Sequence, residues 1–338
     1  MKKIKVGILG LGRIGRMHIQ NMQAMREFEI IQGVDPFLTP ELEAEMKDYG
    51  VQACSKNPDD VFLNPEIEAV FICSTTETHS DYIIRSARNK KAIFCEKPID
   101  HDVERICEAL KVVREEGVVL QLGFVRRFDT HHGKIAKLVK EGKVGNAEML
   151  RITSRDSDIA PMSYLKTSGG IYVDMLIHDF DMARYVMGQE VVEVYAAGSA
   201  LVNPEMKTIG DVDSAFVTLK FENGSLGLVE GSRRSGFGYD QRVEVLGSEG
   251  CLTDYNIANS MVTFSHRGGV DQDAINEGFQ DRYKQAFINE LLEFKDAMLE
   301  GREPSVTGID GLKSVLIAEA ANRSALSGKS EKVEIINL

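Results

Sequence analysis

Apolar runs alternate with amphipathic patterns over the first third of the chain. The apolar runs predict buried strands at Ile4–Leu9, Ile30–Val34, Ala69–Ser74, Lys91–Cys95 and Val118–Leu122, with a short one near Gln52–Cys54. The amphipathic patterns predict helices over Ile14–Met25, Pro40–Tyr49, Thr78–Asn89 and Asp102–Glu116. We expect Asp100 to cap the last of these helices and Gly117 to stop it. Such regular alternation is typical of a parallel sheet that is covered on both faces.

The pattern changes near Gly123, after which strands follow one another more directly. A helix at about Lys134–Glu141 comes first. Strands are then predicted at Ala147–Ser154, Glu193–Leu201, Ala215–Phe221, Ser225–Ser232, Gln241–Leu246, Gly250–Asp254 and Met261–Ser265. Asn223-Gly224 predicts a tight hairpin between two of them. The chain closes with two long amphipathic helices, at about Arg282–Glu300 and Gly311–Ser327.

Length and pattern together predict two domains. A chain of 338 residues exceeds the usual size of one hydrophobic core. We predict an α/β domain over residues 1–123, built on a doubly wound parallel sheet. Residues 124–338 should form an α+β domain with a large, mainly antiparallel open sheet.

Composition and charge exclude several classes of protein. Hydrophobic residues make up 43% of the chain and charged residues 27%, as in ordinary globular proteins. The formal net charge of −12 argues against nucleic acid as a partner, and no apolar run is long enough to span a membrane. The five cysteines are an odd number with no C-x-x-C pair, which favours reduced thiols in the cytoplasm and no zinc site.

A glycine motif joins the first predicted strand to the first predicted helix. GLGRIG places Gly10, Gly12 and Gly15 in the G-x-G-x-x-G spacing, with Arg13 and Ile14 between the last two. A strand before this motif and a helix after it let a pyrophosphate meet bare N–H groups at a helix N-terminus. The motif therefore predicts a dinucleotide site.

Asp35 indicates which dinucleotide binds. It stands at the end of the second predicted strand, where a carboxylate can accept both ribose hydroxyls of adenosine and repel a 2′-phosphate. The following residues, PFLTPE, contain no Arg or Lys that would attract that phosphate. We therefore predict NAD rather than NADP.

Two later strand ends should border the same cofactor, because ligands of open parallel sheets bind outside the carboxyl ends of the strands. Ser74 and Thr75 follow the strand AVFIC, and Glu96-Lys97-Pro98 follows the strand KAIFC. A lysine held between a glutamate and a proline in such a crevice is a candidate for a role in the reaction.

The segment Gly169–Gly188 combines apolar residues with closely spaced polar ones. On one continuous helix, Asp174, His178, Asp181 and Tyr185 would share a face, with Leu176, Phe180, Ala183 and Met187 opposite. A solvated polar stripe is one interpretation. The other is a carboxylate–imidazole pair that faces a cleft and transfers protons.

Motifs along nearly the whole chain resemble those of a known enzyme family. They are GLGRIG, STTETH, CEKP, GFVRRFD, ITSRD, SGGIYVDMLIHDFDMARY and GREPSVTGIDGL. Together they resemble the glucose–fructose oxidoreductase and inositol dehydrogenase (Gfo/Idh/MocA) family, most closely its inositol 2-dehydrogenase branch. The resemblance implies a Rossmann domain, then a domain whose open sheet often joins subunits into dimers or tetramers. It also implies a cis Lys97-Pro98 peptide bond.

The resemblance further implies a catalytic trio of Lys97, Asp174 and His178. His178 would be the base that removes the hydroxyl proton, Asp174 would orient its ring, and Lys97 would hydrogen-bond the substrate oxygen. Arg127 and Asp156 lie in motifs that line the sugar in this family, and Tyr283 lies in a segment resembling another such contact. One departure is the stretch SDIAPM, where the family often has a proline-rich loop beside the substrate.

These features predict NAD-dependent oxidation of a ring hydroxyl of myo-inositol, or of a close stereoisomer, to the ketone. The alternatives are a family member acting on an aldose or another cyclitol, and an NAD-binding regulator without turnover. His79 is expected to cap its helix or touch the cofactor. His131-His132 is expected to be a solvated pair, because no third metal ligand accompanies it at a suitable spacing.

Overall fold

The computed structural model describes residues 3–336, which divide into two compact units. The first unit contains residues 3–125 and Phe287–Lys313. The second unit contains Arg126–Ala286 and Ser314–Ile336. Each unit has a sheet and a hydrophobic core of its own.

The first unit is built on a parallel six-stranded sheet in the order β3-β2-β1-β4-β5-β6. The strands are β1 (Ile4–Leu9), β2 (Phe28–Val34), β3 (Ala53–Ser55), β4 (Ala69–Ile72), β5 (Ala92–Glu96) and β6 (Leu120–Gly123). The parallel sheet predicted for this region is confirmed, and the strand order reverses between β1 and β4, where such folds bind their ligands.

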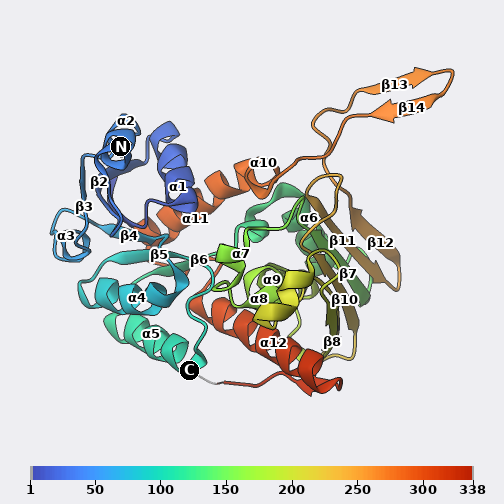
Figure 1. The fold of residues 1–338 in the computed structure, drawn as a ribbon. Helices are drawn as coiled ribbons and strands as arrows, with labels where there is room; N and C mark the ends of the chain where they lie inside the picture. The colour runs from blue at the N-terminus through green and yellow to red at the C-terminus, as the bar shows by residue number, and fades with distance from the viewer. Residues whose placement is uncertain (1–2, 337–338) are drawn as a thin grey trace. The chain divides into compact units, whose positions relative to one another are not determined.

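Helices cover both faces of this sheet. In Figure 1, α1 (Arg13–Ala24) and α11 (Lys284–Glu300) lie along one face, and α4 (His79–Arg88) and α5 (Val103–Glu116) along the other. Phe71 stacks on Phe94 with ring centroids 4.9 Å apart, and Phe294 of α11 meets Phe71 edge-on at 5.2 Å. The first unit thus takes part of its core from near the end of the chain. Shorter helices are α2 (Pro40–Asp48), α3 (Asp59–Phe62) and η1 (Thr76–Thr78).

The second unit is built on a seven-stranded sheet in the order β12-β11-β7-β10-β9-β8-β15. Its strands are β7 (Ala147–Arg155), β8 (Val191–Ser199), β9 (Ser214–Phe221), β10 (Leu226–Ser232), β11 (Asp240–Gly247), β12 (Gly250–Asp254) and β15 (Glu331–Lys332). All neighbours pair antiparallel except β7 and β10, which are parallel. The mainly antiparallel sheet is confirmed, as is the β9–β10 hairpin, in which Gly224 has φ 89°.

One face of this sheet is covered and the other is open. Helices α6 (Thr130–Lys140), α9 (Ile177–Met187) and α12 (Gly308–Ser327) contribute buried residues to the core on the covered face. Strand β9 shows the alternation, since Val217 and Leu219 are buried while Phe216 and Thr218 between them are exposed. The loops of this unit also contain short helical segments, among them η2 (Val125–Phe128), η3 (Pro204–Ile209) and α10 (Phe279–Arg282).

The single helix expected over Gly169–Gly188 is wrong, because the segment forms two helices. Helix α8 (Gly170–Asp174) ends at Asp174, and α9 begins at Ile177. The Leu176 N–H donates to the carbonyl of Ile171, five residues back, so the helical register slips by one residue here. The Leu176 side chain is fully buried against β10, where a Cβ on Gly231 would lie 2.6 Å from it.

The expected polar face is therefore not continuous. Asp181 is buried and Tyr185 is half-buried, whereas the apolar side is buried as predicted at Leu176, Phe180, Ala183 and Met187. The packing of Leu176 against the sheet, rather than the helical spacing of polar and apolar residues, determines the backbone here.

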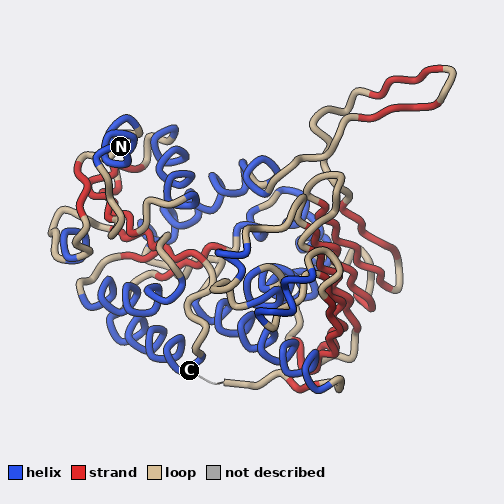
Figure 2. The backbone as a smooth tube through the Cα atoms, in the orientation of Figure 1, coloured by secondary structure: helices blue, strands red, loops and turns tan. Residues whose placement is uncertain are grey.

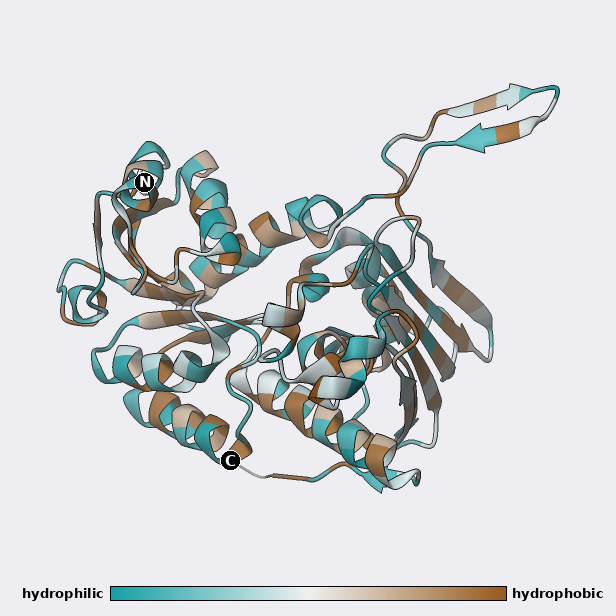
Figure 3. Cartoon of the chain, viewed as in Figure 1, coloured by the Kyte–Doolittle hydropathy of each residue, from teal (hydrophilic) through white to brown (hydrophobic). Residues whose placement is uncertain are grey.

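A two-stranded hairpin, β13 (Thr263–His266) and β14 (Gly269–Gln272), extends beyond the seven-stranded sheet (Figure 2). The pattern had placed β13 among the strands of the large sheet and had missed β14 and β15. Hydrophobic residues occur on both strands of the hairpin (Figure 3), and Phe264 and Val270 are 64% and 62% exposed. Among the described residues, none of the helices combines the length and apolar character needed to cross a membrane.

The cap of α5 is Asp102 rather than Asp100. The Asp102 side chain accepts hydrogen bonds from the N–H groups of Glu104 and Arg105, and Gly117 ends the helix in the left-handed region as predicted. Asp100 instead accepts hydrogen bonds from Ser80 and from the backbone of the turn before the helix.

Replacing the cap tests this assignment. We expect Asp102→Ala to lower the free energy of unfolding by about 1 kcal/mol, because two N–H groups lose their acceptor. Thermal unfolding followed by circular dichroism would measure the effect. Asp48→Ala is a matched control, since Asp48 is an exposed aspartate at the last residue of α2 and should leave stability unchanged. Equal melting temperatures for the two variants would contradict the cap.

Candidate functional site

The glycine motif forms the turn between β1 and α1, and its three glycines serve different purposes. Gly10 has φ 96°, and a Cβ there would lie 2.5 Å from the carbonyl oxygen of Cys73. A Cβ on Gly15 would lie 2.0 Å from the carbonyl oxygen of Gly10. At Gly12 a Cβ would meet nothing within 4 Å. Gly10 and Gly15 are thus needed for the turn itself, while Gly12 presents bare backbone to open space.

The first turn of α1 is suited to hold an anion. Gly12 is the N-cap, no side chain caps the helix, and the first turn contains no acidic residue. The N–H groups of Arg13, Ile14 and Gly15 begin the helix without an intrahelical acceptor, and the helix dipole favours negative charge at this end. These residues fit the pyrophosphate of a dinucleotide.

Asp35 is fixed beside this turn. Its Oδ2 atom accepts a hydrogen bond of 2.9 Å from the Leu11 N–H, and its Oδ1 atom accepts one of 2.9 Å from the Phe37 N–H. The carboxylate is half-buried and retains further acceptor capacity on both oxygens. The arrangement fits ribose hydroxyls, and it also ties the end of β2 to the glycine turn.

His79 connects the ends of β4 and β5. Its Nδ1 atom lies 2.8 Å from the carbonyl oxygen of Pro98 and its Nε2 atom 3.1 Å from that of Ser74. Burial lowers the pKa of His79. This histidine is the first residue of α4, and its side chain braces the two loops. The Lys97-Pro98 peptide bond is cis, as the family resemblance implied.

Glu96, just before Lys97, pairs with a buried histidine. The Nε2 atom of His18 lies 2.8 Å from Glu96 Oε1. A Cβ on Gly123 would lie 2.8 Å from the other carboxylate oxygen, so β6 needs a glycine there. Glu96 thereby anchors the strand end from which Lys97 extends.

In the second unit, Asp174 is held by two side chains that sequence reasoning missed. The Tyr164 hydroxyl donates a 2.6 Å hydrogen bond to Asp174 Oδ1, and Arg233 Nη1 donates one of 3.0 Å to Oδ2. Arg233 is only 2% exposed. Asp174 closes α8 and His178 lies in the first turn of α9, both half-buried.

The parallel pairing of β7 and β10 brings Asp156 to Arg233. Arg155 and Ser232 are register partners at the ends of these strands, so Asp156 and Arg233 leave the sheet at the same edge. The Asp156 N–H donates to the Ser232 carbonyl at 2.9 Å. Burial raises the pKa of Asp156 to about 6, although the nearby charge of Arg233 opposes this shift. The sequence places Asp156 just after β7 and Arg233-Arg234 just after β10. Their proximity could have been predicted only if the parallel register of the two strands had been known.

The remaining predicted substrate residues lie in buried polar surroundings. Arg127 donates two hydrogen bonds, of 2.8 and 2.6 Å, to Asp181. Its neighbour Arg126 is buried and pairs with Asp179 at 2.5 Å. Tyr283 is 1% exposed, its ring lies 5.9 Å from the Arg126 guanidinium, and burial raises the pKa of its phenol. The Tyr283 hydroxyl has no hydrogen-bond partner among the described residues.

The expectation of a solvated histidine pair is wrong for His132. His132 is 1% exposed, and its Nε2 atom lies 3.2 Å from Asp254, with Asp129 nearby. These three groups could hold a metal ion, yet Arg282 already donates a 2.6 Å hydrogen bond to Asp129. Burial acts to raise the pKa of Asp129, but hydrogen bonds and charges from Arg282 and His132 together outweigh it, and the pKa is lowered. The guanidinium supplies the cation of this cluster.

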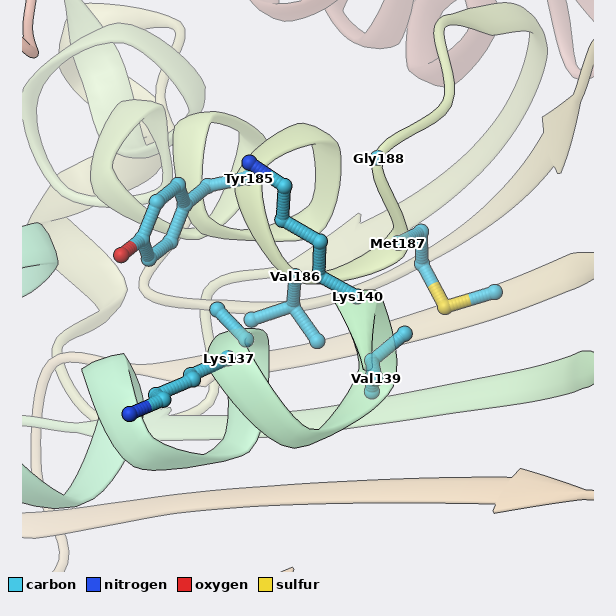
Figure 4. Close-up of a pocket in the computed structure, with 8 residues that line it drawn as sticks. Lys137, Val139, Lys140, Tyr185, Val186, Met187 and Gly188 are labelled. Atoms are coloured by element: carbon cyan, nitrogen blue, oxygen red, sulfur yellow. The ribbon is translucent and has the colours of Figure 1, made fainter. Parts of the chain in front are cut away.

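A cavity of about 620 Å³ lies between α6 and the end of α9 (Figure 4). Val139, Val186 and Met187 give it apolar walls, and Lys137, Lys140 and Tyr185 also line it. None of the predicted site residues lines this cavity, although the guanidinium of Arg127 lies 5.0 Å from the ring of Tyr185.

Comparison with known proteins identifies the class. Residues 4–124 match the model of an oxidoreductase family with an NAD-binding Rossmann fold, and residues 132–253 match the Gfo/Idh/MocA C-terminal domain. The chain therefore belongs to the Gfo/Idh/MocA oxidoreductase family, and its cofactor is NAD.

Individual relatives are similar over almost their entire length. The chain is 39% identical to myo-inositol 2-dehydrogenase of Thermotoga maritima, covering 98% of this chain and 99% of the relative. It is 40% identical to inositol 2-dehydrogenase of Rhizobium meliloti, covering 95% and 96%. The structure of Lactobacillus casei scyllo-inositol dehydrogenase, with bound NAD(H) and scyllo-inositol, matches with a TM-score of 0.92 and 28% identity, covering 98% and 99%.

Asp35 should set the preference for NAD. We expect Asp35→Asn to keep the fold, because the amide oxygen can still accept a backbone hydrogen bond, but to weaken NAD binding by about 10-fold or more. NADP binding should improve, since the charge that repels its 2′-phosphate is lost. Calorimetric titration with each dinucleotide, with Asp48→Asn as control, measures the ratio. An unchanged ratio would exclude Asp35 as the selecting group.

Asp156 should make stability depend on pH. Because the folded chain holds the Asp156 proton more tightly than the unfolded chain, this stabilisation is complete below about pH 4 and is lost as the pH rises through 6. The neutral Asp156→Asn variant lacks the effect. The difference in melting temperature, variant minus wild type, should therefore become more positive by a few degrees between about pH 4.5 and 7.5. A constant difference would rule out the raised pKa.

Proposed function

We propose that the chain oxidises a ring hydroxyl of myo-inositol, or of a close stereoisomer, to the ketone, with NAD as the hydride acceptor. The observation that carries the proposal is Asp174, a carboxylate fixed from both sides by Tyr164 and Arg233 just before His178. Family membership and the names of the relatives support the same chemistry.

The proposed mechanism assigns one task to each member of the trio. His178 takes the hydroxyl proton, because a neutral imidazole is a base matched to neutral pH. Asp174 stabilises the imidazolium that results, and Lys97 hydrogen-bonds the substrate oxygen and favours its developing negative charge. When bound by the residues of the glycine turn and Asp35, NAD would supply the acceptor for the hydride of the carbon that carries this hydroxyl.

An uncharged polyol fits the charges of the second unit. A phosphorylated substrate would require several available cations. The buried arginines of this unit are instead paired with carboxylates within it, in the pairs Arg126–Asp179, Arg184–Glu190, Arg233–Asp174 and Arg282–Asp129. The half-buried Arg127 is paired likewise, with Asp181. Hydroxyl groups are therefore the better match.

Two alternatives differ in the measurement that supports them. A family member acting on an aldose or another cyclitol would show its best turnover on that sugar, and relatives named for both myo- and scyllo-inositol keep the choice of epimer open. An NAD-binding regulator would bind NAD without reducing it. The presence of Lys97, Asp174 and His178 argues against the regulator.

We further propose a cytoplasmic homo-oligomer, a dimer or tetramer. All five cysteines are free thiols, which suits a reducing compartment. The open face of the seven-stranded sheet exposes large apolar side chains that a second copy could cover, namely Met149, Tyr195, Phe216, Leu226 and Leu246.

Assays on a panel of cyclitols and aldoses, with NAD reduction followed by absorbance, test the function. Lys97→Ala, Asp174→Asn and His178→Ala should each lower kcat by about 10²–10⁴-fold on the best substrate, because each removes a group that acts on the transferred proton or charge. NAD affinity, measured by calorimetry, should stay within a few fold. His266→Ala, on the exposed β13, is the control.

Wild-type turnover in any variant of the trio would remove that residue from the mechanism. NAD binding without reduction on every sugar would favour the regulator instead.

A further inference from the structure

Tyr164 contributes a polar group beside the carboxylate assigned to catalysis. It lies on the one-turn helix α7 (Met162–Leu165), just after the stretch SDIAPM that departs from the family pattern. Its hydroxyl donates a 2.6 Å hydrogen bond to Asp174 Oδ1, while the residue as a whole is 46% exposed. A phenol that is both exposed and tied to Asp174 stands where an incoming polyol can reach it.

Helix α7 is anchored, so the Tyr164 position is defined. The neighbouring Leu165 is 2% exposed, so its side chain is buried and anchors the helix. The N–H groups of Tyr164 and Leu165 donate to the carbonyl of Pro161 at 3.0 and 3.2 Å. The amide of Asn203 contacts the Met162 sulfur at 3.6 Å.

The hydrogen bond to Asp174 determines the direction in which the Tyr164 hydroxyl proton points. A phenol has one proton, and Asp174, as a carboxylate, can only accept. Arg233 donates to the other oxygen of Asp174, so the carboxylate accepts from a cation on one side and from Tyr164 on the other. With that proton directed at Asp174, the Tyr164 oxygen can meet a substrate hydroxyl only as an acceptor.

The Tyr164 oxygen and the Asp174 carboxylate are adjacent hydrogen-bond acceptors, so together they favour a substrate with two adjacent O–H donors. Vicinal hydroxyls of a cyclitol supply two O–H donors at the spacing of neighbouring ring carbons, whereas a ketone or ether oxygen supplies none. We propose that Asp174 also accepts a hydrogen bond from one substrate hydroxyl, and that Tyr164 is a specificity-determining residue that accepts one from the neighbouring hydroxyl. This inference rests on the proposed cyclitol oxidation and adds a second recognition point to it.

The test is Tyr164→Phe, assayed with myo-inositol, scyllo-inositol and a series of mono-deoxy inositols. Loss of a hydrogen bond within a charged network should lower kcat/KM for the best cyclitol by about 10–100-fold, mainly through a higher KM. One deoxy analogue should be equally poor for wild type and variant, because it lacks the hydroxyl that Tyr164 reads. Tyr255→Phe is the matched control, a 71% exposed tyrosine that follows β12 in the same unit.

The outcomes separate this inference from the function on which it rests. A wild-type enzyme that oxidises no cyclitol overturns both. Active wild type with an unchanged Tyr164→Phe variant overturns the specificity role alone. So does a variant that loses the same factor on every analogue, since a purely structural role acts uniformly. The specificity role is supported if the losses in kcat/KM caused by Tyr164→Phe and by removal of one substrate hydroxyl are not additive, while the melting temperature of the variant is unchanged.

Discussion

The parallel pairing of β7 and β10 is the constraint on which the candidate site of the second unit depends. In a fully antiparallel sheet, the ends of neighbouring strands would leave at opposite edges. Here the parallel register puts Asp156 and Arg233 side by side. Arg233 then reaches Asp174, so a strand end rather than the helix fixes the carboxylate assigned to catalysis.

Buried arginine–carboxylate pairs follow from the same organisation. Taking a guanidinium out of water is costly unless a carboxylate compensates it, and removal of one partner leaves an unpaired buried charge. The second unit uses this arrangement repeatedly, at Arg126, Arg184, Arg233 and Arg282. These pairs orient the acidic side chains and leave the unit poorly suited to anionic substrates. Recognition by hydroxyl groups is consistent with that balance.

Sequence reasoning succeeded where structure is set locally. The glycine turn, the strands of the first unit and the Asn-Gly hairpin depend on neighbouring residues, and each could be predicted from a short window. Sequence reasoning failed where contacts between distant segments determine the structure. Leu176 packs on Gly231 and breaks the expected helix, Arg233 depends on strand register, and His132 is buried by Asp129 and Asp254. Gly231, Asp174 and Asp254 are each far along the chain from the residue they contact, beyond the reach of a local pattern. Asp129 is the exception, since it caps the helix that holds His132 three residues later.

The helix break changes how the pair Asp174–His178 should be understood. On one continuous helix, the i, i+4 spacing alone would have placed both groups on one face. In the structure, the orientation of Asp174 at the end of α8 comes from Tyr164 and Arg233, while His178 belongs to α9. The orientation of the Asp174 carboxylate can therefore be changed through Tyr164 and Arg233 without disturbing α9, the helix that holds the imidazole. In the proposed mechanism, substrate selectivity is assigned to Tyr164 on α7 and general-base chemistry to His178 on α9, two separate helices.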